Sequence, residues 1–403
     1  MTADAASFDL APGFRAAAVA CGLKAGGALD LALISADRPC AAAGVFTANR
    51  VKAAPVLYDQ EVLASNAPAI RAVIANSGCA NACTGPGGMA DTRRMAALTA
   101  ESLGCGAEQV LVLSTGVIGR RLDMTKVAAG IAAVTSTGAQ MGAPAAARAI
   151  LTTDTRPKTA GADLTMGGRR VAIRGFAKGA GMIHPNMATM LSVVTTDAAL
   201  PPAALRAALR AAVARSFNRV SVDGDMSTND TVLLLASGAP AGAVAESDLA
   251  AFTAALTEAC TSLARQIARD GEGATRLVEI AVTGARDEAE AHRVADGIAR
   301  SSLVKTAIHG GDPNWGRVLA AAGCSGAAID PDRLTLALGD AGNALTIVRN
   351  GLPAAFDERE ASSRLRDDPV YLHLDLGLGD GAATAWTCDF SAEYVTINAH
   401  YTT

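Results

Sequence analysis

The sequence predicts a mixed α/β fold, and three observations lead to this expectation. Through the first half of the chain, short apolar runs alternate with helix-like blocks, which is typical of α/β proteins. The composition, with 50% apolar and 18% charged residues over 403 positions, is that of a globular protein with a sizeable core. Toward the C-terminus, apolar and polar residues alternate as they do in half-buried strands.

Buried strands are expected where a short apolar run ends at turn-forming residues. Five such runs lie at residues 31–35, 72–76, 109–114, 170–174 and 190–196. Between the second and third runs, a helix is expected over residues 89–103. Another helix is expected to begin at Asp123, because an Asp side chain can accept a hydrogen bond from the first helical turn.

Two long helices and a β-rich tail are expected in the second half. After Pro202, apolar residues recur every three or four positions, which predicts a helix that starts at proline. A second helix is expected over residues 247–270, with Gly271 as its C-terminal stop. In the tail, residues 371–379 and 394–402 alternate apolar with polar side chains and predict an antiparallel sheet edge.

Charge and composition exclude several classes of function. The net charge of -4, with both signs mixed along the chain, leaves no basic stripe for nucleic acid. The first residues include Asp4 and Asp9 and lack a basic segment before an apolar stretch, so we expect a cytoplasmic protein. Residues 127–147 are long enough to span a bilayer, but they contain Gln140 and Pro144 and are predicted to form a helix and a loop.

The cysteine pattern does not indicate a metal centre. Eight cysteines are spread along the chain, and in a reducing cytosol they are expected to be free thiols. Cys79 and Cys83 form the only close pair, but no His or Cys at zinc-like spacing accompanies them. The five histidines are scattered as well, so no metal ligands are predicted.

Two glycine-containing segments hold the candidate chemistry, although each has an ordinary structural interpretation. KGAGMIHPNMATML, residues 178–191, places Thr189 at the head of a strand, where β-branched residues are common. STGVIG, residues 114–119, follows a buried strand and by itself predicts a strand-to-turn exit. A glycine in such a turn lets the backbone approach another group closely.

Residues 178–191 closely resemble the self-cleavage motif of the ornithine acetyltransferases, also called bifunctional glutamate N-acetyltransferases. Other segments resemble that family in the same order along the chain: NSGCANACTG (76–85), STGVIG (114–119), TTDT (152–155), VDGDMSTNDT (222–231) and NAHYTT (398–403). The resemblance covers essentially the whole chain. Cys79 and Met226 depart from the residues common in the family, which bears on fine specificity.

The resemblance implies an enzyme of arginine biosynthesis that cleaves itself between Ala188 and Thr189. Residues 1–188 would form an N-terminal segment with the oxyanion hole, and residues 189–403 a C-terminal segment that begins with the nucleophile Thr189. The implied fold is a layered sandwich of mixed sheets and helices built jointly by the two products. The cleaved chains would associate as an α2β2 heterotetramer.

The implied reaction transfers acetyl from N2-acetyl-L-ornithine to L-glutamate in a ping-pong sequence through acetyl-Thr189. A Thr hydroxyl needs a base, and cleavage would supply one, because a free α-amine has a pKa of about 7.7–8.0. The resemblance assigns Thr115 and Gly116 to the oxyanion hole. It implies substrate contacts at Thr153, Lys178, Thr189, Glu272, Asn398 and Thr403.

For two of these contacts, the charge suggests a partner. We hypothesise that Lys178 faces a substrate carboxylate and Glu272 the ornithine ammonium, because ionised pairs form the stronger hydrogen bonds. Without the resemblance, a solvated lysine and a carboxylate at a helix end would be the simpler interpretations. Contacts at Asn398 and Thr403 predict that the tail is tied into a sheet. No metal or organic cofactor is expected, and use of acetyl-CoA as a second acetyl donor stays open.

Two other functions remain as alternatives. A self-cleaving aminopeptidase or amidase would use the same N-terminal nucleophile but would let water attack the acyl-enzyme. A non-enzymatic binding or scaffold protein would use the glycine-rich segments as anion-binding turns. Acetyl release without glutamate distinguishes the first alternative, and an intact chain on a denaturing gel supports the second.

Overall fold

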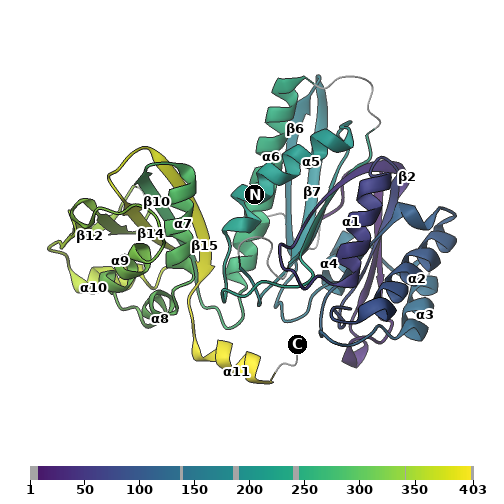
Figure 1. Ribbon diagram of the computed structural model, residues 1–403, viewed down its shortest axis with the longest axis horizontal. Coiled ribbons are helices and arrows are strands. Elements are labelled where there is room, and N and C mark those ends of the chain that lie inside the picture. Colours follow the sequence, from purple (N-terminus) through teal and green to yellow (C-terminus); the bar gives the residue numbers. More distant parts are fainter. Residues whose placement is uncertain (1–7, 137–138, 185–189, 239–244, 341, 401–403) are drawn as a thin grey trace.

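Two mixed β-sheets with helices packed on them form the protein, as Figure 1 shows for the computed structural model, which confirms the predicted α/β class. The structure describes residues 8–136, 139–184, 190–238, 245–340 and 342–400. The first sheet contains β1 (Phe14–Val19), β2 (Leu31–Phe46), β3 (Ile70–Asn76), β4 (Val110–Ser114), β5 (Gln140–Met141), β6 (Lys158–Met166), β7 (Arg169–Lys178), β8 (Leu191–Thr196) and β9 (Thr231–Ala236). Its main path runs β4-β3-β2-β9-β8-β7-β6, with β1 paired to β2 and β5 to β1.

The helices associated with this sheet are α1 (Ala54–Asn66), α2 (Gly85–Leu103), α3 (Met124–Val134), α4 (Ala143–Ala149), α5 (Pro202–Arg215) and α6 (Glu246–Arg269). Helices α1 and α2 contact β4, whereas α6 contacts β6 and β7. The Asp123 side chain accepts the Lys126 N–H at 3.3 Å, so the predicted N-cap of α3 is confirmed. Helix α2 begins four residues earlier than predicted, because Pro86 in its first turn is preset for a helical start.

Strand β2 is much longer than the run predicted at residues 31–35. The apolar pattern is interrupted by three exposed residues, Asp37, Arg38 and Pro39. Because of this interruption, the apolar pattern did not predict that the strand continues beyond residue 35. The register shifts between Ser35 and Cys40, and such irregularities tolerate a proline that cannot donate a hydrogen bond. The first part of β2 pairs with β3 and the second part with β9, so one strand joins the two halves of the sheet.

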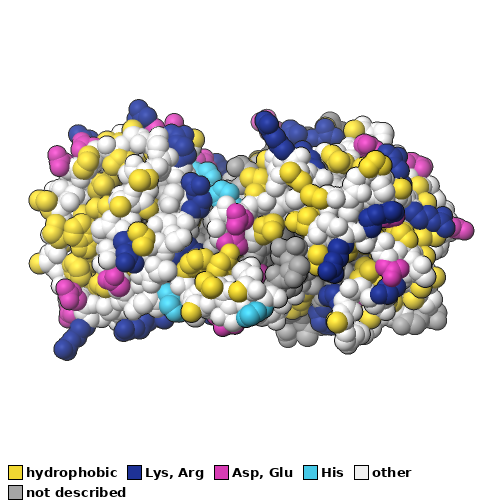
Figure 2. Space-filling model, turned by 60° about the horizontal axis from the view of Figure 1, so that its bottom comes forward, with side chains coloured by type: hydrophobic (Ala, Val, Ile, Leu, Met, Phe, Trp, Pro, Cys, Tyr) yellow, Lys and Arg dark blue, Asp and Glu magenta, His cyan; other side chains and the backbone are white. Residues whose placement is uncertain are grey.

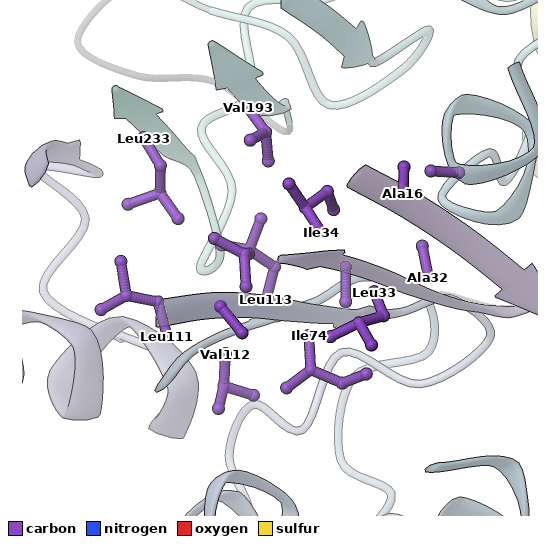
Figure 3. Packing of buried hydrophobic residues seen from close by; sticks show 14 of the residues in the cluster. Ala16, Ala32, Leu33, Ile34, Ile74, Leu111, Val112, Leu113, Val193 and Leu233 are labelled. Carbon is purple, nitrogen blue, oxygen red and sulfur yellow. The ribbon is translucent and has the colours of Figure 1, made fainter. Parts of the chain in front are cut away.

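The core of the first sheet is shared by segments from both sides of residues 185–189. Strands β8 and β9, which follow that segment, lie between β2 and β7, which precede it. In Figure 3, Ile34, Leu113, Val193 and Leu233 gather in one cluster although they come from four different strands. On the opposite face, Leu234 packs in a second cluster with residues of α5 and α6. Both faces of β8 and β9 are therefore covered.

The second sheet has the order β13-β12-β11-β14-β10-β15. Its strands are β10 (Leu277–Ala285), β11 (Thr335–Leu338), β12 (Leu345–Arg349), β13 (Leu352–Pro353), β14 (Val370–Asp375) and β15 (Gly381–Cys388). Helices α7 (Glu288–Ala299), α8 (Ser302–Gly310), α9 (Trp315–Gly323) and α10 (Glu358–Arg364) accompany it. Short 3-10 helices occur at Ala25–Gly27, Ala107–Gln109, Phe217–Arg219 and Pro331–Arg333.

The predicted β-rich tail is partly wrong. Residues 371–379 do contribute to β14, but this strand lies inside the sheet, and β15 forms the antiparallel edge. The described residues of 394–402 form α11 (Ala392–His400) instead of a strand. This helix buries none of its residues, so its alternating sequence does not report a buried strand face. Ser391 Oγ accepts the Glu393 N–H at 3.2 Å and helps to start the helix.

Residues 127–147 contain the predicted helix as part of α3, but where a loop was expected they form the short strand β5 and most of a second helix, α4. No helix in the described ranges has the length and apolar character needed to cross a membrane. On the face shown in Figure 2, basic and acidic side chains are interspersed and form no continuous basic stripe.

Candidate active site

A polar cavity of about 240 Å³ brings together the predicted functional residues that the structure describes. Its walls come from the ends of β4 and β7, the turns before β9 and after α6, and α11. Figure 1 shows α11 leaving the second sheet after β15 and running back toward the first sheet. The predicted residues that line the cavity are Thr115, Gly116, Thr153, Lys178, Glu272 and Asn398.

Three predicted residues, Ala188, Thr189 and Thr403, lie outside the described residues. The segment with the first two is flanked by described residues with defined contacts. Met182, on one side, lines the cavity. Met190, on the other, is buried and donates its N–H to Asp230 Oδ1 at 2.9 Å.

The turn after β4 carries Thr115 and Gly116, the two residues predicted to form the oxyanion hole. Gly116 has φ 132°, and a Cβ atom there would lie 2.4 Å from the carbonyl carbon of Gly78, so only glycine fits. The Thr115 N–H donates to Asn76 O at 3.0 Å. Thr115 can therefore serve an oxyanion only through its hydroxyl. Among the described residues, the Gly116 N–H has no acceptor, which leaves it available to a ligand.

Lys178 is a buried ammonium at the end of β7. Its Nζ donates to Thr152 Oγ1 at 2.7 Å and lies 3.7 Å from Asp154 Oδ2. Burial lowers the pKa of Lys178, although the Asp154 carboxylate opposes this effect. Asp154 also accepts hydrogen bonds from Lys158 Nζ at 2.6 Å and from the Gly179 N–H at 2.6 Å.

The charges behind Lys178 form a paired network. Burial favours the protonated form of Asp154, but Lys178 and Lys158 together hold its pKa well below the usual range. Lys158 also contacts Asp270, which in turn accepts a hydrogen bond from the Thr155 hydroxyl. Since this network compensates two buried ammonium groups with two buried carboxylates, Lys178 is held in place from behind the cavity.

Glu272 supplies a carboxylate to the same cavity. It follows the end of α6 and is 8% exposed, and its N–H donates to Ala180 O at 2.9 Å. Asn398 Nδ2 donates to Glu272 Oε2 at 2.8 Å, so the tail reaches the site from a helix and not from a sheet. At Gly181 a Cβ atom would lie 2.3 Å from the Glu272 carboxyl carbon, which shows how closely this backbone approaches the carboxylate.

Two further carboxylates and a tyrosine line the cavity, and no function was predicted for them from the sequence. Asp223 and Asp225 precede β9, and Tyr394 comes from α11. Burial raises the pKa of the Asp223 carboxyl to about 6, even though three backbone N–H groups donate to it. Burial, followed by the charge of Asp223, also raises the pKa of Tyr394. The only sequence signal for the two Asp residues was their place in the family-like segment 222–231.

The cavity therefore contains groups of both charges. Lys178 provides a cation, while Glu272 and Asp223 provide carboxyl groups. Such an arrangement can hold a small molecule that carries both an anionic and a cationic group. Within the described ranges no cluster of three or more His, Cys, Asp or Glu side chains could bind a metal ion, and all eight cysteines are free.

Comparison with known proteins places this architecture in a family. The family model described as "ArgJ family" matches residues 15–403. A relative from Parasynechococcus marenigrum, named "Arginine biosynthesis bifunctional protein ArgJ", is 49% identical over 391 residues, which are 97% of this chain and 94% of the relative. A relative of the same name from Symbiobacterium thermophilum is 51% identical over 396 residues, with 97% of each chain covered.

A solved structure is also similar. The crystal structure of arginine biosynthesis bifunctional protein ArgJ from Bacillus halodurans has 46% sequence identity and a TM-score of 0.50, and the match covers 53% of this chain and 100% of that chain. The family model and the curated relatives extend over nearly the whole sequence. The chain therefore belongs to the ArgJ family and is an acetyltransferase enzyme of arginine biosynthesis.

Proposed function

We propose that this enzyme transfers acetyl from N2-acetyl-L-ornithine to L-glutamate through an acetyl-Thr189 intermediate, after it has cleaved itself between Ala188 and Thr189. The observation that carries the proposal is the convergence of six predicted residues in one cavity. They come from separate parts of the chain, and they combine oxyanion donors, a cation and a carboxylate. This is the set of groups that the two substrates and the reaction require.

Cleavage begins when Thr189 Oγ attacks the carbonyl carbon of Ala188. The C–N bond breaks, the acyl group moves to Thr189 Oγ, and the proton of the hydroxyl moves to the nitrogen, which becomes a free α-amine. Water then hydrolyses the ester and leaves a carboxylate on Ala188. The amine of Thr189, with a pKa of about 7.7–8.0, can take the proton of its own hydroxyl in the next reaction.

Acetyl transfer repeats the same chemistry on a substrate. Thr189 Oγ attacks the acetyl carbonyl of acetylornithine, and the resulting oxyanion is stabilised by the Thr115 hydroxyl and the Gly116 N–H. The C–N bond then breaks and the protonated amine of ornithine leaves. The glutamate amine attacks the acetyl ester, and Thr189 regains its hydroxyl proton. This ping-pong sequence uses no metal or organic cofactor.

The charged groups of the cavity suggest how the substrates are held. Lys178 would pair with the α-carboxylate that both substrates carry, and Thr153 also lines the cavity. Glu272, oriented by Asn398, would accept the side-chain ammonium of ornithine. The Asp223 carboxyl adds further negative charge to the cavity. The contact at Thr403 and the use of acetyl-CoA as an alternative donor remain predictions.

Cleavage is supported by the way the first sheet is built. Because β8 and β9 lie between β2 and β7, the segments before and after the proposed cleavage site share one core. In addition, the whole Bacillus halodurans chain matches only 53% of this one, about the share that residues 189–403 make up. The proposal includes two cleavage products, residues 1–188 and residues 189–403. It also includes their association as an α2β2 assembly.

Intact-mass analysis of the purified chain beside a Thr189→Ala variant tests the proposal. We expect two fragments from the wild type, one ending at Ala188 and one starting at Thr189, and a single intact chain from the variant. Incubation with acetylornithine alone should then add one acetyl group to the 189–403 fragment. A Thr189→Ala variant that moves acetyl to glutamate at the wild-type rate would contradict the proposal.

The same assay separates transferase from hydrolase. In the absence of glutamate, a transferase should stop after one acetyl group per site, because no acceptor attacks the ester. Continuous release of acetate without glutamate would instead support the self-cleaving amidase. Release of ornithine measured with and without glutamate gives the decisive comparison.

A further inference from the structure

Asn229 and Asp230 are adjacent residues directly before β9. They lie between the proposed nucleophile Thr189 and the proposed oxyanion donors Thr115 and Gly116. Asn229 is 4% exposed and lines the cavity, and Asp230 is fully buried. Strand β9 is parallel to β8, with Leu191 opposite Thr231. Asp230 therefore precedes β9 where Met190 precedes β8, and Met190 is the residue that follows Thr189.

The side chain of Asp230 holds the main chain of Met190. Its Oδ1 accepts the Met190 N–H at 2.9 Å, while the Met190 carbonyl accepts the Thr231 N–H at 3.1 Å. Both polar groups of the Met190 backbone are thus bound to the start of β9. Burial raises the pKa of Asp230 well above its usual range, so a neutral acceptor suffices for this contact.

The side chain of Asn229 holds the oxyanion turn. Its Nδ2 donates to Ser114 O at 2.8 Å and to Ala80 O at 2.7 Å. Ser114 directly precedes Thr115. The Thr228 hydroxyl donates to Asn229 Oδ1 at 2.6 Å and thereby fixes the orientation of the amide.

We propose that Asn229 and Asp230 are positioning residues that set the distance between the nucleophile and the oxyanion donors. Asp230 holds the backbone directly after Thr189, and Asn229 holds the backbone directly before Thr115. Because the two residues are consecutive in a buried strand start, they form a short and stiff link between both groups. The inference rests on the proposed function, which takes Thr189 as nucleophile and Thr115 with Gly116 as oxyanion donors.

Loss of the Asp230–Met190 contact or of the Asn229–Ser114 contact should slow both self-cleavage and acetyl transfer, without weakening substrate binding. A displacement of about 1 Å in a reacting group can cost about 100-fold in rate. We therefore expect Asp230→Ala and Asn229→Ala to cleave themselves on the order of 100 times more slowly than the wild type. Per cleaved chain, kcat should fall similarly, while KM for acetylornithine stays near the wild-type value. Asp230→Asn keeps an oxygen acceptor for Met190 and should restore most of the cleavage rate.

Asp59 provides a matched control. It is also fully buried, its Oδ1 accepts one backbone N–H, that of Val112 at 2.8 Å, and burial likewise raises its pKa. It does not line the cavity. Asp59→Ala should lose thermal stability to a similar degree as Asp230→Ala but retain its rate of cleavage and its kcat.

The experiment measures cleavage by intact mass over time, kcat and KM on the cleaved fraction, and thermal unfolding of all variants. Wild-type and Thr189→Ala chains are tested first, and an uncleaved wild type or an active Thr189→Ala would sink the proposed function itself. If the wild type cleaves as expected, the inference fails alone when Asp230→Ala and Asn229→Ala cleave and turn over at wild-type rates. It also fails when Asp59→Ala slows as much as they do. If Asp230→Ala does not fold, Asn229→Ala decides: a lower kcat with unchanged KM supports the inference, and an unchanged kcat overturns it.

Discussion

At the scale of single residues, one hydrogen bond limits what Thr115 could contribute to the proposed oxyanion hole. The Thr115 N–H is already bound to Asn76 O, so the backbone of Thr115 cannot receive a developing negative charge. Its hydroxyl and the Gly116 N–H are the donors that remain at this turn. The contribution of Thr115 should therefore depend on its oxygen atom and not on its backbone.

Replacing the Thr115 hydroxyl tests whether this group, and not the Thr115 backbone, contributes to catalysis. Thr115→Val keeps the shape of the side chain but removes the donor, and we expect kcat to fall by about 100- to 1,000-fold. Thr115→Ser keeps the donor and should retain most of the activity. Thr99→Val is a suitable control, because it removes a buried hydroxyl that bonds Met95 O in α2, away from the cavity. Equal kcat values for Thr115→Val and Thr115→Ser would contradict the assignment.

The Asp223 carboxyl should make substrate binding in the cavity sensitive to pH. Its pKa is raised to about 6, so the group is ionised above pH 6 and becomes neutral as pH falls through that value. Protonation removes a negative charge that would face the ornithine ammonium. We expect KM for acetylornithine to rise as pH drops below 6 and this rise to be smaller in Asp223→Asn. An acetyl donor without the side-chain ammonium should show the smaller pH dependence with the wild type as well.

At the scale of elements, α11 contributes to the cavity but should contribute little to the stability of the fold. The helix buries none of its residues, yet Tyr394 and Asn398 line the cavity. Phe390, just before the helix, packs its ring against Tyr394 with centroids 4.4 Å apart. The alternation of residues 394–402 predicted a strand, and this prediction was wrong because an exposed helix leaves no periodic burial in its sequence.

Removal of residues 392–403 should therefore affect activity more than folding. We expect kcat/KM for acetylornithine to fall by roughly tenfold or more, because Glu272 loses a charge-assisted hydrogen bond worth about 1.5–3 kcal/mol. The melting temperature should change little, because no buried side chain of α11 is lost. Val395→Ala, at a position that is 63% exposed, serves as a control with wild-type activity. A truncated chain that is unfolded would show that the helix has a structural role instead.

At the scale of the whole molecule, the order of strands decides whether the two proposed cleavage products could separate. Strand β2 crosses from β3 to β9, and the path β2-β9-β8-β7 places strands from after the cleavage segment between strands from before it. Each of the two products would expose apolar strand faces if they separated. The hydrophobic effect should therefore keep them together.

Cleaved protein should elute from a size-exclusion column with both fragments in one peak. Only denaturant should separate them, since β8 and β9 pair with strands of the other fragment on both sides. Native mass spectrometry checks the result and also gives the number of copies in the assembly. Free 1–188 fragment in native buffer would contradict the shared core.

Periodicity predicted the strands and helices whose burial is regular. It located β3, β4 and β8 and both long helices α5 and α6 within a few residues, because each of them buries a repeating set of side chains. It predicted β2 only as far as Ser35, because the exposed residues 37–39 interrupt the apolar pattern of this strand. It could not find Asp223 or Tyr394 as site residues, because nothing in their local pattern indicates a cavity.

The amino-acid sequence by itself determined the fold class, most core elements and, through its resemblance to a known family, the groups that should carry the chemistry. Only the tertiary structure decided that Thr115, Lys178, Glu272 and Asn398 meet in one cavity, that α11 is a helix, and that Asn229 and Asp230 connect the backbone of Met190 to the end of β4. The physical reason is that periodicity records which side of an element is buried. It does not record which distant element covers that side or which polar groups become partners there.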